Sequence, residues 1–105
     1  MNILILGSGI VGANLAKKLS EQGKNVFLLD DDANELKNLA ERFDIKTIYD
    51  DPLNPSFYKN FDSKIDCFIA VTRSDEKNII TSKFAKEFLK VDKSIARVRN
   101  QNLIL

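Results

Sequence analysis

Strand-like apolar runs alternate with helical patterns along the whole of this 105-residue chain. The apolar runs lie at 2–6, 25–29, 45–49, 66–72 and 94–98. Between them, apolar residues recur every three or four positions, as in helices with one buried face, and the proline-containing loop leaves room for at most a short helix after Pro55. Because consecutive parallel strands need crossover connections of this kind, the alternation predicts an α/β fold with right-handed crossovers.

Five strands connected in this way predict a three-layer, Rossmann-like, doubly wound parallel sheet with strand order 3-2-1-4-5. The first run, "NILIL", is apolar throughout, which is typical of a parallel strand covered on both faces. The run at 45–49 alternates and is more polar, which suits an edge strand. The last residues, "NQNLIL", are expected to trail off where a fuller dinucleotide-binding fold would add a sixth strand. We therefore expect residues 1–105 to form a single domain.

Composition and charge argue against several classes of protein. The net charge of +1 gives no reason to expect a nucleic-acid partner, and no run approaches the ~20 apolar residues that direct membrane insertion requires. The single cysteine, Cys67, permits no intrachain disulfide and no cysteine-based metal site, so we expect no metal and a reducing, cytoplasmic location. Histidine is absent, which removes the commonest general base, and we expect no catalytic residues.

Three glycines follow the first strand with the spacing of a dinucleotide-binding turn. Gly7, Gly9 and Gly12 match Gly-x-Gly-x-x-Gly between a strand and a helix. In such a turn the first glycine permits the tight bend, the second lets the backbone approach a pyrophosphate, and the third lets the helix pack close to the strand. The alternative is a glycine turn that only joins the strand to the helix. The predicted phosphate-binding residues are Gly7, Ser8, Gly9, Ile10, Val11 and Gly12.

The first and fourth helices differ at their N-termini. The first helical turn, "IVGAN", carries no acid, so its positive end is free for an anion. The helix after the fourth strand begins with Ser74 as its expected cap, and Asp75 and Glu76 neutralise its N-terminus. Its apolar residues recur every four positions as far as Phe88, which predicts one long helix. Phosphate is therefore expected at the first helix and not at the fourth.

An acid ends the second strand, where the ribose of a nucleotide would lie. Asp30 follows Gly12 by 18 positions, and its carboxylate can accept both ribose hydroxyls. A fixed negative charge there disfavours a 2′-phosphate, so NAD(H), ADP or ATP is expected in preference to NADP. Asp31 and Asp32 are available to cap the next helix, so Asp30 is expected to be free for the ribose. The alternative is that Asp30 is itself the helix cap.

Other polar residues follow the remaining strands, and the carboxyl ends of parallel strands share one edge of the sheet, where ligands bind. Asp51 is equally suited to accept from the adenosine or to cap a turn before Pro52. Arginine matches phosphate oxygens bidentately, although each arginine taken singly is also consistent with a solvated surface charge. The candidates at this edge, besides the glycine loop and Asp30, are Asp31, Asp50, Asp51, Thr72, Arg73, Asp75, Arg97 and Arg99.

Four segments of the chain are informative together: "ILILGSGIVGANLAKKL", "VFLLDDD", "IAVTRSDEKNI" and "IARVRN". In their order and spacing they resemble the KTN domain, also called TrkA-N, which is the N-terminal, nucleotide-binding half of RCK regulators. The family serves the Trk and Ktr potassium-uptake systems and some potassium channels. The resemblance implies a non-catalytic cytoplasmic sensor at the inner face of the membrane. It would bind NAD(H) or ADP/ATP, assemble as a homodimer or larger ring, and gate a potassium transporter or channel by ligand-dependent conformational change.

The resemblance also implies residue roles. Asp30 would hold the adenosine ribose, Asp51 would lie by the adenine, and Thr72 and Arg73 would line the phosphate path. The strand-five arginines, Arg97 and Arg99, would reach phosphates, including across a subunit boundary.

Two features depart from the family pattern. Asp50-Asp51-Pro52 replaces the usual Gly-Asp-Ala, and Ala13-Asn14 stands where many members have an arginine. The loss of that cation favours a dinucleotide or diphosphate over a triphosphate. The C-terminal RCK domain is expected to be absent from the chain. The competing hypothesis is the cofactor-binding half of an NAD-dependent oxidoreductase.

Overall fold

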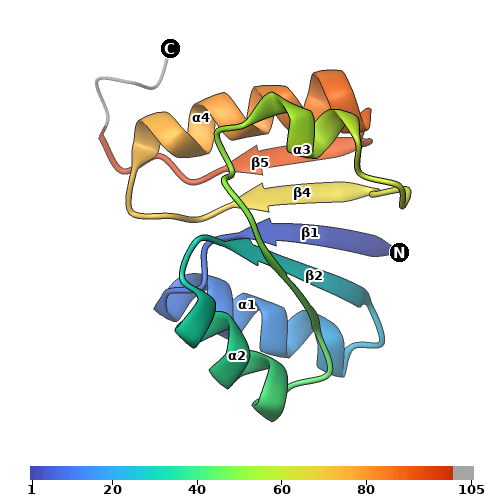
Figure 1. Cartoon of the computed structure of the whole chain (residues 1–105), viewed down its shortest axis with the longest axis vertical. Helices are drawn as coiled ribbons and strands as arrows, with labels where there is room; N and C mark the ends of the chain where they lie inside the picture. The colour runs from blue at the N-terminus through green and yellow to red at the C-terminus, as the bar shows by residue number, and fades with distance from the viewer. Residues whose placement is uncertain (101–105) are drawn as a thin grey trace.

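The computed structural model describes residues 1–100, which are built around one parallel sheet (Figure 1). Its strands are β1 (Asn2–Leu6), β2 (Asn25–Asp30), β3 (Lys46–Tyr49), β4 (Cys67–Ala70) and β5 (Lys93–Ala96). They pair in parallel in the order β3-β2-β1-β4-β5. The predicted α/β class and the Rossmann-like strand order are confirmed. The expectation for residues 101–105 lies outside the described part of the chain.

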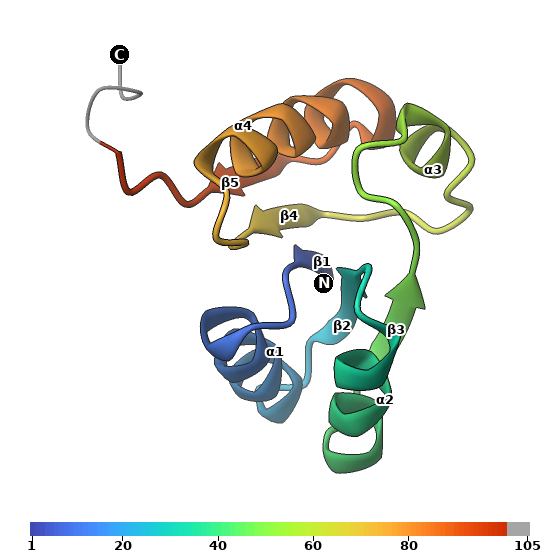
Figure 2. The same ribbon diagram turned by 60° about the vertical axis from the view of Figure 1, so that its left-hand side comes forward.

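Helices cover both faces of the sheet (Figure 2). On one face lie α1 (Ile10–Glu21) and α2 (Ala33–Arg42), and on the other lie α3 (Pro55–Lys59) and α4 (Asp75–Phe84). The segment between β3 and α3 passes from one face to the other around the β3 edge. None of the helices within residues 1–100 combines the length and the apolarity that crossing a bilayer requires.

The helix caps follow the sequence closely. Asp32 caps α2 by accepting a hydrogen bond from the Glu35 N–H, and Ser74 caps α4 by accepting one from the Lys77 N–H. These contacts satisfy N–H groups that have no partner inside a helix. The expected long fourth helix differs in its last part, which is a π-helical turn, η1 (Ala85–Leu89). This turn ends at Lys90 in a left-handed conformation, where the Lys86 ammonium donates to two carbonyls that follow.

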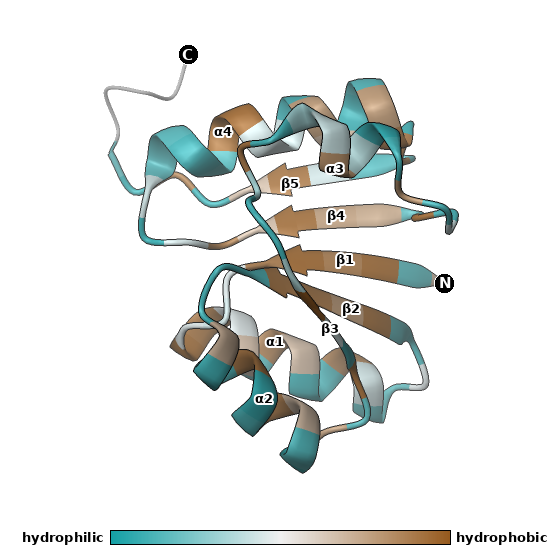
Figure 3. Cartoon of the chain, in the orientation of Figure 1, coloured by the Kyte–Doolittle hydropathy of each residue, from teal (hydrophilic) through white to brown (hydrophobic). Residues whose placement is uncertain are grey.

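The core has two halves, one on each face of the sheet. Because side chains alternate along a strand, Ile3 and Ile5 of β1 pack under α1 and α2, while Leu4 and Leu6 pack under α3 and α4. All four residues are at most 3% exposed. Figure 3 shows the apolar central strands between helices that carry both apolar and polar segments. The carboxyl end of β1 is therefore held rigidly from both faces, and the glycine loop begins there.

Strands β4 and β5 end earlier than their apolar runs suggest. Hydrophobicity predicts a fourth strand over 66–72 and a fifth over 94–98, whereas β4 ends at Ala70 and β5 at Ala96. One further ladder bond follows each strand, from the Val71 N–H to the Leu6 carbonyl and from the Arg97 N–H to the Ala70 carbonyl. Beyond these bonds the segments that follow β4 and β5 leave the sheet. Thr72 and Arg97 therefore lie at its carboxyl edge.

The two tyrosines of the chain offer a matched test of this core. Tyr58 of α3 is buried, its hydroxyl donates to the Pro52 carbonyl at 2.6 Å, and burial raises its pKa. Tyr58→Phe leaves that carbonyl without its partner, so we expect a loss of about 1–2 kcal/mol in the free energy of unfolding, measured with urea. Tyr49→Phe, at an exposed site, should change it by less than about 0.5 kcal/mol. Equal effects of the two substitutions would contradict the role given to the Tyr58 hydroxyl.

Candidate functional site

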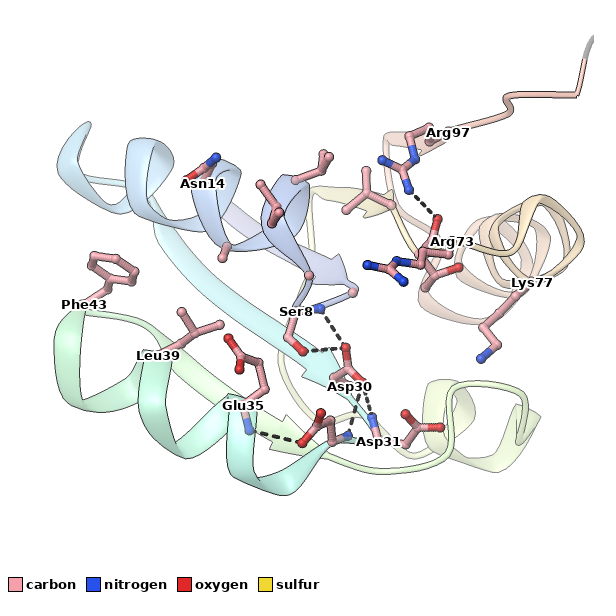
Figure 4. A pocket seen from close by; sticks show the side chains of 18 of the residues that line it. Ser8, Asn14, Asp30, Asp31, Glu35, Leu39, Phe43, Arg73, Lys77 and Arg97 are labelled. Carbon is pink, nitrogen blue, oxygen red and sulfur yellow. Dashed lines mark hydrogen bonds between the residues drawn. The ribbon is translucent and has the colours of Figure 1, made fainter.

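A cavity of about 800 Å³ opens at the carboxyl edge of the sheet (Figure 4). Its walls are the loop between β1 and α1, the turn between β2 and α2, and the loop between β4 and α4 with the residues that follow β5. Most of the predicted site residues line it: Gly7, Ser8, Gly9, Ile10, Val11, Asp30, Asp31, Thr72, Arg73, Arg97 and Arg99. The fold therefore brings together residues that are far apart in the sequence.

Each of the three positions in the loop favours glycine for a different physical reason. Gly7 has φ 116°, a left-handed conformation that side chains rarely adopt. A Cβ on Gly12 would lie 1.7 Å from the Gly7 carbonyl oxygen, so this glycine lets α1 pack against the end of β1 and lies behind the cavity. Gly9 has an ordinary φ of −68°, and a Cβ there would meet nothing within 4 Å. Because neither backbone nor packing requires a glycine at position 9, its bare backbone leaves open space toward the cavity.

The first turn of α1 is left open for an anion. Gly9 is its N-cap, no side chain caps it, and no acid lies in its first turn. Its first N–H groups have no partner inside the helix and carry the positive end of the helix dipole. The first helical turn and the open space at Gly9 together form a cradle that suits a phosphate group.

The carboxylate of Asp30 is more engaged than the sequence predicts. Its Oδ2 accepts from the Ser8 N–H at 2.6 Å and the Ser8 hydroxyl at 2.7 Å, and its Oδ1 accepts from the N–H groups of Asp31 and Asp32 at 2.7 and 3.1 Å. Asp32 is the N-cap of α2, as expected. Asp30 is nevertheless not free for a ribose, because its carboxylate already has these four donors. Burial alone would raise the pKa of Asp30, and the hydrogen bonds from Ser8 and Asp31 outweigh burial, so that this pKa lies below its ordinary value.

Two predicted aspartates after β3 lie outside the cavity. Asp50 lines a separate hollow of about 470 Å³ against α3. The Asp51 carboxylate accepts from the Leu53 N–H at 3.0 Å, so of the two alternatives it fulfils the turn cap before α3. The charges of both aspartates lie near α3, where they add to the effect of burial in raising the pKa of Tyr58.

Asp75 also lies away from the cavity. Its carboxylate accepts from the N–H groups of Arg99 and Asn100 at 3.0 and 2.8 Å, and these bonds hold its pKa below its ordinary value. Asp75 lies in the first turn of α4, as expected, and its carboxylate also ties α4 to the residues after β5. Within residues 1–100, no group of three or more histidine, cysteine, aspartate or glutamate side chains is placed to hold a metal ion.

A buried amide organises the wall formed by the β4–α4 loop. Asn78 is fully buried, and its Oδ1 accepts from both the N–H and the hydroxyl of Thr72. Its Nδ2 donates to the carbonyls of Thr72 and Arg97 at 3.1 and 2.9 Å. Asn78 therefore fixes the end of β4 against the end of β5. The sequence identifies it only as part of a motif, because a single asparagine in a helix gives no sign of the direction of its side chain.

The two strand-five arginines are partly occupied within their own chain. The guanidinium of Arg97 donates to the Thr72 carbonyl at 2.8 Å, and that of Arg99 donates to the Arg73 carbonyl. The Arg97 Nε is buried and has no hydrogen-bond partner among the described residues. An unpaired buried donor is costly, so this atom is one that an incoming anion would satisfy.

Two other cations face the cavity without a partner in residues 1–100. Arg73 is exposed, and Lys77 in the first turn of α4 is half-buried. Figure 4 shows both side chains extending into the cavity, opposite the wall that carries Asp30 and Asp31. Lys77 was not among the predicted site residues, because a lysine beside two acids reads as surface charge. The cavity thus has an acidic wall at the start of α2 and a basic wall at the start of α4.

The cavity continues into a groove between α1 and α2 that the sequence analysis did not anticipate. Its lining there is Ala13, Asn14, Glu35, Leu39, Arg42 and Phe43. Ala13 and Asn14, noted as departures from the family pattern, contribute no charge to this lining.

Comparison with known proteins gives a consistent assignment. A family model described as the TrkA-N domain matches residues 3–104. The Trk system potassium uptake protein TrkA of Halomonas elongata is 36% identical over 100 residues, and that of Haemophilus influenzae is 30% identical over 105 residues. These matches cover 94% and 99% of this chain but only 22% and 23% of the two relatives.

One solved structure shows how closely the fold is shared. The NAD(P)-binding domain of an exopolyphosphatase-related protein from Archaeoglobus fulgidus superposes with a TM-score of 0.83. The superposition covers 95% of this chain and 74% of that one, at 23% sequence identity. At this level of identity the likeness concerns the fold alone.

The engagement of Asp30 predicts a pH-dependent contribution to stability. Asp30→Asn replaces a charged acceptor by a neutral amide, so we expect a loss of about 1–2 kcal/mol in the free energy of unfolding at pH 7. Because the pKa of Asp30 is lower in the folded state, its stabilisation is fully present above the unfolded pKa of about 4 and is lost as the pH falls through the folded value. Urea unfolding of both proteins should therefore show a difference that shrinks below about pH 4.

Asp44→Asn is the matched control for this prediction. Asp44 is exposed, and no described residue donates a hydrogen bond to its carboxylate. Its substitution should change the free energy of unfolding by less than about 0.5 kcal/mol. A difference for Asp30→Asn that stays constant down to pH 3 would show that the carboxylate does not stabilise the loop through its charge.

Proposed function

Since this chain belongs to the TrkA-N domain family, we propose that it is a nucleotide-binding regulatory domain of a potassium-uptake system. It binds NAD(H) or ADP/ATP, with NADP disfavoured, in the cavity at the carboxyl edge of the sheet. The observation that carries this proposal is the open space at Gly9, at the uncapped N-terminus of α1 and one residue from the Ser8 contact with Asp30.

The residues of the cavity fit such a ligand in kind. The bare backbone at Gly9 and the first turn of α1 suit a phosphate, and the buried Nε of Arg97 and the free cations of Arg73 and Lys77 add positive charge nearby. The carboxylate of Asp30 can accept from a ribose hydroxyl in exchange for one of its present donors, and its charge repels a 2′-phosphate. A ligand with an anionic centre and a sugar at one end therefore matches the division of the cavity into basic and acidic walls.

The regulatory step is a competition for the arginines after β5. In the structure, the side chains of Arg97 and Arg99 bind carbonyls of the β4–α4 loop, which ties the chain leaving β5 to that loop. A ligand phosphate that attracts either guanidinium would weaken this tie, and one that does not reach it would leave it intact. Ligands then differ in their affinity for the two arrangements, which is the condition for any ligand-driven shift.

The domain is further proposed to work in the cytoplasm, at the inner face of the membrane, as part of a homodimer or larger ring that contacts a potassium transporter or channel subunit. The names of the TrkA relatives support this setting, and the chain spans less than a quarter of their lengths. A catalytic role as half of an NAD-dependent oxidoreductase has less support, because the chain contains no histidine and the cavity acid Asp30 is held by four hydrogen bonds.

Nucleotide binding is tested by titrating NADH, ADP and ATP into the domain by calorimetry. We expect binding, with affinities that differ among the three ligands. In Gly9→Val the side chain fills the space at the glycine loop, so all three affinities should fall at least about tenfold while the free energy of unfolding changes by about 1 kcal/mol or less.

Gly23→Asn is the control, because Gly23 has φ 82° and open surroundings far from the cavity, and asparagine tolerates this conformation. Equal affinities for the three ligands in the unaltered domain would remove the basis for a ligand switch. Undiminished binding by Gly9→Val would place the nucleotide elsewhere.

The basic wall is tested with two lysines of the same helix. Lys77→Gln removes a cation that lines the cavity, so we expect ADP to bind about threefold to tenfold more weakly, with a smaller dependence of affinity on salt. Lys83→Gln, at an exposed position outside the cavity, should leave ADP binding unchanged. The same loss in both variants would indicate a general effect of net charge and no specific role for Lys77.

A further inference from the structure

The acceptor capacity of the Asp30 carboxylate is already used within the chain. A carboxylate offers about four lone-pair positions, and Asp30 accepts four hydrogen bonds, at 2.6 and 2.7 Å on Oδ2 and at 2.7 and 3.1 Å on Oδ1. A ribose brings two further hydroxyl donors to the same group. Each ribose hydroxyl that bonds to this carboxylate therefore needs one of the existing donors to leave.

Only one of the four donors is able to leave without moving the backbone. Three are backbone N–H groups, of Ser8, Asp31 and Asp32. The Ser8 N–H belongs to the glycine loop, in which Gly7 packs against Val71. The N–H groups of Asp31 and Asp32 belong to the turn before α2, which is fixed because Asp32 caps that helix. The fourth donor is the Ser8 hydroxyl, which turns about a single side-chain bond.

The Ser8 hydroxyl also lies in the right place to compete with a ligand. Ser8 lines the cavity although it is only 4% exposed, and Figure 4 shows its side chain directed at Asp30 from the glycine loop. A ribose hydroxyl that bonds to Oδ2 would compete with this group for the same oxygen. An alanine at the same position would leave the three backbone donors and one open acceptor position.

We propose that the Ser8 hydroxyl is an internal competitor for the ribose and so determines how strongly this domain recognises the sugar of its ligand. The inference rests on the proposed nucleotide binding and deepens it. In the unaltered chain one ribose hydroxyl gains little, because it replaces a hydrogen bond of the same kind, from a hydroxyl to a carboxylate oxygen. In Ser8→Ala the same hydroxyl gains a new bond to a carboxylate.

The experiment compares ADP with 2′-deoxy-ADP and 3′-deoxy-ADP by calorimetry. For the unaltered chain we expect at least one deoxy analogue to bind within about threefold of ADP, because its missing hydroxyl is the one that must displace Ser8. For Ser8→Ala, the affinity ratio of ADP to that analogue should rise by about threefold to tenfold. Ser20→Ala, whose hydroxyl donates to the Lys17 carbonyl away from the cavity, should leave both ratios unchanged.

The possible outcomes separate this inference from the function on which it rests. If the unaltered chain already prefers ADP to both analogues by more than about tenfold, the Ser8 hydroxyl does not compete, and this result needs no variant to fold. Ratios that are the same in Ser8→Ala and the unaltered chain also overturn the inference, although nucleotide binding itself would stand. If none of the three nucleotides binds, the proposed function fails together with the inference.

Discussion

The close approach of Gly12 to the Gly7 carbonyl is the constraint on which the site depends. It seats the start of α1 directly on the end of β1, where a Cβ would be 1.7 Å from an oxygen atom. Gly7 in turn lies against the backbone of Val71: a Cβ added to Gly7 would be 3.1 Å from the carbonyl atoms of Val71. Because β1 is buried on both faces, this junction joins the ends of two strands and one helix without freedom to shift. This junction positions the cavity walls without the help of a ligand.

The fold and the placement of the glycine loop could be predicted from the sequence for a physical reason. Periods of two and of three to four residues report which side chains are buried, and parallel strands joined by right-handed crossovers admit few orders. Strand ends are less predictable, as at Ala70 and Ala96, because apolar residues such as Val71 and Val98 continue past the last residue of each strand. The π-helical turn at Ala85–Leu89 has no sequence signal of its own kind, since its apolar spacing is also that of an α-helix.

The sequence predicted many of the residues that lie at the candidate site. It did not predict which of their donors and acceptors are unpaired and so available to a ligand. Topology alone places the residues after each strand at one edge, and this brought Asp30, Thr72 and Arg97 to the cavity. It does not say which way a side chain turns: Asp75 bonds to the chain after β5, while Lys77, two residues later, extends into the cavity. Nor does it show that the carboxylate of Asp30 and the guanidinium of Arg99 already have partners.

Those internal partners have a consequence for how such a domain senses a ligand. A site whose polar groups bond to one another is stable without a ligand, because few buried donors or acceptors are left unsatisfied. Under the proposed function, binding would be an exchange of hydrogen bonds, and its free energy would be a difference between similar contributions instead of a large gain. At Asp30 the exchange involves the glycine loop through Ser8, and at Arg97 it involves the β4–α4 loop through the Thr72 carbonyl. On the proposed function, each ligand group that bound here would loosen a specific contact between two parts of the chain, and a small difference between ligands would become a difference in protein conformation.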